Sequence, residues 1–156
     1  MPWELTIRNE DESLMGKPDE VIARISAAVS AFKWETEPSM LERIKDMPDH
    51  PFHALIPTWS EETKASMSRS KTYGIFDGDG FFVRLYGFDA QELAAVFAEV
   101  RWDGNPIPLI AAICRPNNWI AVDDATTQPI DLDAKAASGW EAFRDYRDRV
   151  IQSIKK

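Results

Sequence analysis

The sequence has only one cysteine, two histidines and seven glycines among its 156 residues. A single cysteine, Cys114, cannot form a disulfide within the chain, which is typical of proteins from a reducing compartment. A chain of this length buries roughly 70% of the surface that its unfolded form exposes, enough to fold without disulfides or a structural metal. We therefore expect a single domain over residues 1–156 and a cytoplasmic location.

Long apolar runs are lacking as well. Outside the segment that holds the histidines, the longest uncharged run is 104–114, whereas a membrane-spanning helix needs roughly 18 apolar residues. The N-terminal part soon reaches Glu10, Asp11 and Glu12, where a secretory signal would have a basic end and then an apolar stretch. We expect neither an export signal nor a membrane partner.

Basic residues are outnumbered. The chain has 18 lysines and arginines against 26 aspartates and glutamates, a net charge of -8. Residues 120–137 hold four acids against one base, whereas residues 138–156 hold five bases against three acids. A nucleic-acid binder needs clustered basic side chains to neutralise phosphates, so we expect no nucleic-acid partner. An acidic surface instead favours encounter with a basic protein.

The usual catalytic motifs are missing: the chain has no Gly-rich phosphate loop, no G-x-S-x-G and no His-Glu-x-x-His. Both histidines lie close together, His50 and His53, with Asp49 beside them. Imidazole and carboxylate groups bind zinc or iron, and histidine acts as a general base near neutral pH. A small hydrolase or metal-dependent enzyme centred on these residues is therefore an alternative, although nearby prolines prevent a helix from fixing their spacing. We expect no cofactor.

Two other segments with reactive side chains have structural explanations. Cys114 lies on the apolar face of a predicted helix, where free cysteine usually packs as a small hydrophobic residue. The run 77–80 reads Asp-Gly-Asp-Gly, but Phe81 stands where a calcium loop would need its next oxygen ligand. The glycines are those of a tight β-hairpin turn.

Hydrophobic periodicity predicts an α+β domain, in which a mostly antiparallel or mixed sheet of about six short strands carries helices on one or both faces. Strands are expected at 3–7 and 32–35, with hairpins at 71–86 and 119–132. Helices are expected at 18–31, 40–47, 89–100, 106–114 and from 138 onward. Residues 48–59 read as a Pro-rich connection. Arg147 interrupts the apolar stripe of the last helix.

The segment 114–132 continues from a helix into a Trp-containing strand, an Asp, a polar turn and an acidic return strand. It resembles a hairpin of small uncharacterised bacterial cytosolic proteins, including immunity proteins of polymorphic-toxin systems. Asn118 and Gln128 stand where that pattern has glycine, and asparagine readily adopts the left-handed conformation. The resemblance implies a protein that acts by binding, and it transfers no functional residue.

From these observations we predict a non-enzymatic, immunity-like binding module that engages a basic protein surface. Tryptophan is frequent at binding hot spots, and two of the six tryptophans, Trp59 and Trp102, fall in predicted loops. The candidate binding residues are these two tryptophans and the hairpin aspartates Asp123, Asp124, Asp131 and Asp133. A second alternative to this module, besides the enzyme, is an accessory domain that self-associates, so we expect a monomer or a homodimer.

Overall fold

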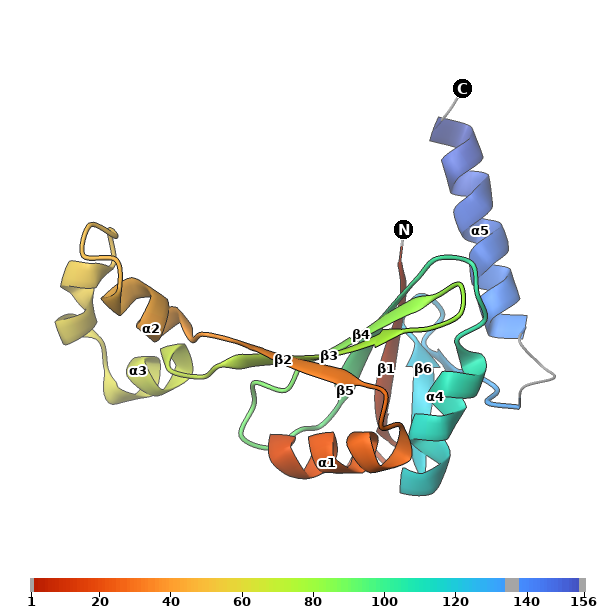
Figure 1. Ribbon diagram of the computed structural model, residues 1–156, viewed down its shortest axis with the longest axis horizontal. Helices are drawn as coiled ribbons and strands as arrows, with labels where there is room; N and C mark the ends of the chain where they lie inside the picture. Colours follow the sequence, from red (N-terminus) through yellow and green to blue (C-terminus); the bar gives the residue numbers. More distant parts are fainter. Residues whose placement is uncertain (1, 134–137, 155–156) are drawn as a thin grey trace.

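The computed structural model describes residues 2–133 and 138–154, and within them seven strands form one antiparallel sheet (Figure 1). The strands are β1 (Trp3–Asn9), β2 (Lys33–Glu37), β3 (Lys71–Asp77), β4 (Phe82–Tyr86), β5 (Val96–Arg101), β6 (Trp119–Asp123) and β7 (Gln128–Pro129). The helices are α1 (Pro18–Ala28), α2 (Met40–Lys45), α3 (Glu61–Met67), α4 (Ile107–Cys114), α5 (Ser138–Ile154) and the short 3₁₀ helices η1 (His53–Thr58) and η2 (Arg115–Asn117). The strand order across the sheet is β2-β3-β4-β5-β1-β6-β7. The expected α+β class is confirmed, with one strand more than expected.

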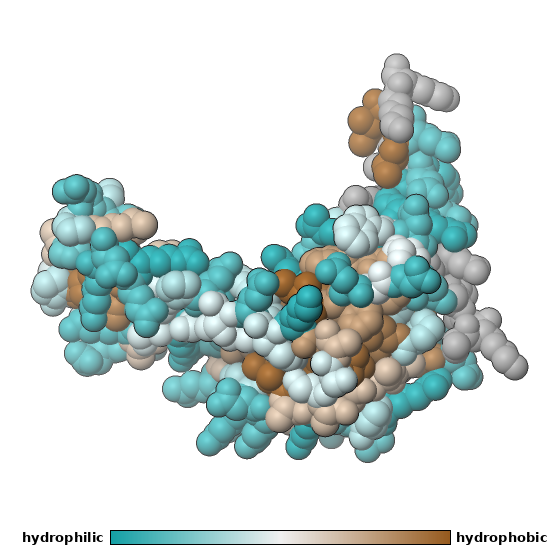
Figure 2. Space-filling view, viewed as in Figure 1, coloured by the Kyte–Doolittle hydropathy of each residue, from teal (hydrophilic) through white to brown (hydrophobic). Residues whose placement is uncertain are grey.

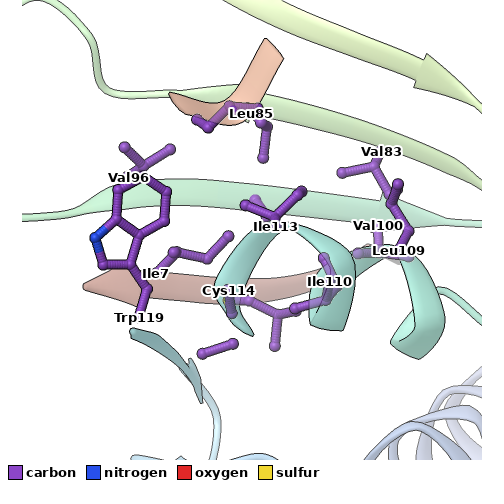
Figure 3. Close-up of a cluster of buried hydrophobic side chains, with 14 of the residues drawn as sticks. Ile7, Val83, Leu85, Val96, Val100, Leu109, Ile110, Ile113, Cys114 and Trp119 are labelled. Carbon is purple, nitrogen blue, oxygen red and sulfur yellow. The ribbon is translucent and has the colours of Figure 1, made fainter. Parts of the chain in front are cut away.

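The hydrophobic core lies between one face of this sheet and the helices α1 and α4 (Figure 1). The alternation expected of β1 is observed, since Trp3, Leu5 and Ile7 are at most 1% exposed. The apolar face of α4 packs onto these strands, and Figure 3 shows Ile113 and Cys114 directed toward them. The helices α1 and α4 therefore cover the same face of the sheet (Figure 1).

The helix α4 begins and ends as its sequence predicts. The Asn105 side chain accepts a hydrogen bond from the backbone N–H of Ile107 at 3.0 Å, and Pro106 precedes the first turn. After α4 and η2 the chain turns at Asn118, whose φ of 55° is left-handed. Asparagine tolerates this conformation, so the chain reverses directly into β6.

The strands β2 and β3 form a long ribbon that carries residues 38–70 away from the rest of the molecule (Figure 1). We call residues 38–70 the tip. Ser39 caps α2 by accepting a hydrogen bond from Glu42 N at 3.2 Å, and Ser60 caps α3 by accepting one from Thr63 N at 3.1 Å. The helix α3 was not predicted, and the expected Pro-rich connection contains η1.

The helix expected at 89–100 is wrong, because this segment contains β5. Helical spacing is shown by Leu93, Val96, Phe97 and Val100. The alternation of residues 96–100, however, also fits a strand. Val96, Ala98 and Val100 alternate onto the core face, and β5 is paired between β4 and β1. β-branched side chains fit a buried strand well, and the pairing with two neighbours decides between the two periods.

The last helix, α5, begins at Ser138 as expected and projects from the molecule (Figure 1). Arg147, the residue that interrupts its apolar stripe, is 7% exposed. Its guanidinium donates to the carbonyl oxygen of Trp102 at 3.1 Å and binds the carboxylate of Asp103. Arg147 thus attaches α5 to the loop after β5. No helix among the described residues is both long enough and apolar enough to cross a membrane.

Candidate interaction surface

The four aspartates of the predicted binding hairpin do not form one group. Asp123 is 6% exposed, and its carboxylate accepts a hydrogen bond from the backbone N–H of Ala125 at 2.9 Å. Asp131 accepts in the same way from the N–H of Asp133, and Asp133 forms an ion pair with Arg115 at 3.4 Å. Three of the four therefore hold turns or neighbouring side chains. Asp124 is exposed and lies on the side of the sheet opposite the core.

The two predicted interface tryptophans are placed far apart in the fold. Trp59 is half-buried and follows η1 in the tip. Trp102 is 58% exposed, follows β5 and packs against Phe82, with their ring centroids 5.6 Å apart. The tip and the end of β5 are different parts of the molecule in Figure 1, so these tryptophans do not belong to a common surface.

The histidines are half-buried in the tip. The Nδ1 atom of His50 accepts a hydrogen bond from the backbone N–H of Phe52 at 3.1 Å, so this nitrogen stabilises the local turn. Over residues 2–133 and 138–154, no group of three or more His, Cys, Asp or Glu side chains is placed to hold a metal ion. Asp49, His50 and His53 are thus not placed together as a metal-binding group.

Cys114 is fully buried in the core, as expected. Burial in apolar surroundings raises the pKa of its thiol to about 12. Because the thiolate is the nucleophilic form, Cys114 is chemically inert near neutral pH. Its function is core packing.

The sheet face opposite α1 and α4, which we call the open face, consists of the residues that alternate with the buried ones. In β4 the burial alternates, with Val83 and Leu85 in the core and Phe82, Arg84 and Tyr86 half-exposed on the open face. The open face is continuous across four neighbouring strands, because β4, β5, β1 and β6 are paired in register.

One row of residues across the open face is largely apolar. Tyr86 pairs with Phe97, Phe97 with Thr6, and Thr6 with Val122. The rings of Tyr86 and Phe97 are 5.4 Å apart. All four side chains of this apolar row are half-exposed. Such a row offers rigid aromatic surface, the kind that anchors protein interfaces.

The next row is charged. Arg84 pairs with Glu99, and Glu99 with Glu4, while the backbone N–H of Asp124 donates to the carbonyl oxygen of Glu4 at 3.1 Å. Arg84 forms an ion pair with Glu99 at 3.4 Å, and Arg101 binds the same carboxylate. The side chain of Glu99 is only 9% exposed, and its negative charge is compensated by these two arginines.

Arg84 links the charged row to the aromatic side chains. Its guanidinium carbon lies 5.1 Å from the ring centre of Tyr73 and 5.8 Å from that of Tyr86. A guanidinium over an aromatic face is attracted by the ring electrons. Arg84 is thereby held against the sheet by two rings and one carboxylate.

Glu4 and Asp124 form what we call the acidic corner of the open face. Asp124 accepts a hydrogen bond from the Thr6 hydroxyl at 2.6 Å, and neither carboxylate pairs with a basic side chain among the described residues. The two carboxylates lie close to Tyr86. Burial raises the pKa of the Tyr86 phenol, and the charges of Glu4, Asp124 and Glu99 raise it further, partly offset by Arg84. The corner is therefore a site of uncompensated negative charge beside an aromatic row.

A shallow pocket of ≈ 250 Å³ continues the apolar row toward the loop after β4. Its lining includes Tyr73, Tyr86, Phe88 and Phe97. A side chain of a bound partner would fit into it. This pocket and the acidic corner lie on opposite sides of Tyr86 along the open face.

Comparison with known proteins gives no relative for this chain: no family model matches it, and neither a curated protein nor a solved structure does.

The sequence contains one signal for this surface. In the predicted hairpin 71–86, Tyr73, Phe82 and Tyr86 alternate with residues of the core face, so that these aromatic side chains fall outside the core. The acidic corner, in contrast, needs the order of the strands, because β1 and β6 bring Glu4 and Asp124 together from opposite ends of the sequence.

Proposed function

We propose that this protein is a non-enzymatic binding module whose open face engages a basic protein surface. The observation that carries the proposal is the acidic corner. Like charges directly opposite each other on a sheet destabilise it, and Glu4 pairs with Glu99. Arg84 and Arg101 bind Glu99, which leaves Glu4 and Asp124 for a lysine or arginine from outside.

The apolar row supports the same proposal. Interfaces owe most of their affinity to a few aromatic or arginine anchors that are surrounded by polar contacts. Tyr86 and Phe97 offer such an anchor, and the charged row runs beside it along its whole length. Charge complementarity at the corner would fix the orientation of the partner and speed the encounter.

The resemblance of residues 114–132 to immunity proteins suggests one form of this function. An immunity-like protein binds a toxin, and here the toxin would present the basic surface. The open face includes Val122 and Asp124, which belong to or follow β6 within that segment.

Capture of a partner from cells of the source organism tests the proposal when matched variants are compared. Glu4→Lys with Asp124→Lys reverses the corner, and Asp131→Lys with Asp133→Lys makes the same charge change elsewhere. We expect a basic protein to be captured, with retention falling at least about tenfold for the first pair and less than about twofold for the second. Added salt should weaken capture.

The opposite pattern would contradict the proposal. If reversal at Asp131 and Asp133 abolished capture while reversal of the corner left it intact, the binding surface would lie on the β6–β7 side of the molecule. Capture of an acidic partner would also count against it. So would the finding that reversal of the corner weakens the capture of no protein.

A further inference from the structure

The tip buries too few apolar side chains to be complete by itself. Of its large apolar residues only Ile44 is buried, at 1% exposed, although all residues from 38 to 70 are described. Short helices in water are marginal unless an apolar face packs against something. The helices α2 and α3 contact one another, but the long β2–β3 ribbon holds them away from the main core (Figure 1).

The uncovered apolar residues are large and numerous. Met40, Met47, Phe52 and Leu55 are 49%, 54%, 52% and 45% exposed. Together they leave on the order of 400 Å² of apolar surface in water, and exposed apolar surface of this extent often binds partners. Figure 2 shows apolar atoms at the surface of the tip among hydrophilic ones. Methionine side chains also adapt readily to an apposed surface.

The tip is nearly neutral in an otherwise acidic chain. Residues 38–70 hold five acids and four bases, so they contribute -1 to the net charge of -8. Two copies of this protein repel each other over most of their surface, because like charges dominate it. A contact of tip with tip therefore adds little to this repulsion.

We infer that the tip is a dimerisation element, covered by the tip of a second copy of the chain. In a twofold dimer the same patch serves on both sides, so an apolar patch is complementary to itself. A stable interface needs about 800 Å² and 20–30 residues from each partner. The four exposed side chains supply about half of that area, and the 33 residues of the tip supply enough neighbours for the rest.

This dimer would leave the open face unobstructed. The ribbon separates the tip from β1 and β6, on which the acidic corner lies (Figure 1). A tip-to-tip dimer therefore presents two open faces, and two linked sites bind a repeated partner more strongly than one. The inference does not depend on the proposed function, because it concerns other residues.

Light scattering after size-exclusion chromatography, over a dilution series of the full chain, tests the inference. The wild type should show a mass of twice 17.7 kDa that falls toward one chain on dilution. Phe52→Gln with Leu55→Gln should weaken the dimer at least about tenfold, because apolar contacts at the centre of an interface are lost. Leu14→Gln is the matched control, since Leu14 is 56% exposed outside the tip and should not affect the mass.

Three results would overturn the inference. The first is a wild type that stays monomeric at every concentration. The second is a dimer that Leu14→Gln weakens as much as the tip variant does. The third is a dimer that only Trp102→Gln with Ile154→Gln dissociates, which would place the interface at α5, where Trp102 and Ile154 are also exposed. Circular dichroism of each variant establishes that it is folded.

Discussion

Tyr86 lies at one end of the apolar row and the acidic corner lies beside Thr6 toward the other end, yet the charges of the corner act on the Tyr86 phenol across the sheet. Burial and the three carboxylates disfavour the negatively charged phenolate, which is why its pKa lies above the ordinary 10.0. The native state therefore holds this proton more tightly than the unfolded chain does. The stability that results is fully present below pH 10 and is lost as the pH rises through the pKa of the folded protein.

An ultraviolet titration of the phenol tests this arrangement. The wild type should contain a tyrosine transition above the ordinary pKa that Tyr86→Phe removes. Glu4→Gln should lower the pKa of that transition, because one of the carboxylates that disfavour the phenolate is then neutral. Glu92→Gln, at an exposed position that does not act on Tyr86, serves as the control. A transition that is indifferent to Glu4→Gln would place the corner elsewhere.

The burial of Cys114 should protect its thiol from reagents. Because burial raises its pKa to about 12, the native thiol should react with an aromatic disulfide reagent far more slowly than the same thiol in denaturant. The absorbance of the released thiolate gives both rates. Equal rates would mean that the sulfur is accessible and that α4 does not pack as described.

Individual residues were easier to assign when their role was local. The burial of Cys114 and the left-handed turn at Asn118 follow from neighbouring residues, and both could be predicted. The role of Asp123 could not, because the sequence shows it only as one of several acids, whereas in the fold it is buried and accepts a hydrogen bond from the backbone N–H of Ala125. For Glu4 the sequence predicts only a place in a strand, because its neighbours on the open face, Glu99 and Asp124, come from distant segments.

Among the described contacts of α5, those of Arg147 join the helix to the loop after β5. Arg147 is 9% exposed in its side chain and binds the loop after β5 through Trp102 and Asp103. We expect Arg147→Met to destabilise the protein by about 1.5–3 kcal/mol, since hydrogen bonds to a charged group are lost and the carbonyl of Trp102 loses its donor.

Urea unfolding checks this value against a matched control. Arg149 is exposed on the same helix, and Arg149→Met should change the unfolding free energy by less than about 0.5 kcal/mol. Equal effects of the two substitutions would show that the buried contacts of Arg147 do not attach α5.

Removal of the tip should leave the core intact. Glu37 and Lys71 form the last pair of the β2–β3 ribbon, so a two-residue Asn-Gly turn can replace residues 38–70. We expect this shortened protein to keep the circular dichroism and methyl NMR spectra of the folded core, because within 38–70 only Ser39 and Ile44 are buried. A molten or insoluble product would show that the tip contributes to the core.

Elements were predictable where a single periodicity was present. The hairpin at β3–β4 and the helix α4 have clear turn and cap signals, so they could be placed within a few residues. The segment of β5 fits both periods, and only its pairing with β1 and β4 selects the strand. The helix α3 has a good Ser60 cap but no apolar face, which explains why hydrophobic spacing did not reveal it.

For the whole molecule, charge and shape divide the surface into parts with different chemistry. The open face carries aromatic side chains and the carboxylates of the acidic corner, and the tip carries apolar side chains with little net charge. Binding at the open face should therefore weaken with added salt, whereas association through the tip should not. This division could not be predicted from the sequence, because net charge and composition do not reveal which strands are neighbours.

The most direct test of binding at the open face is an NMR titration with a short oligoarginine peptide, a simple stand-in for a basic protein surface. The account predicts chemical-shift changes concentrated at the backbone amides of Glu4, Tyr86 and Asp124 and absent from the double variant Glu4→Lys with Asp124→Lys. Changes centred on Asp131 and Asp133, or spread evenly over the acidic surface, would contradict it.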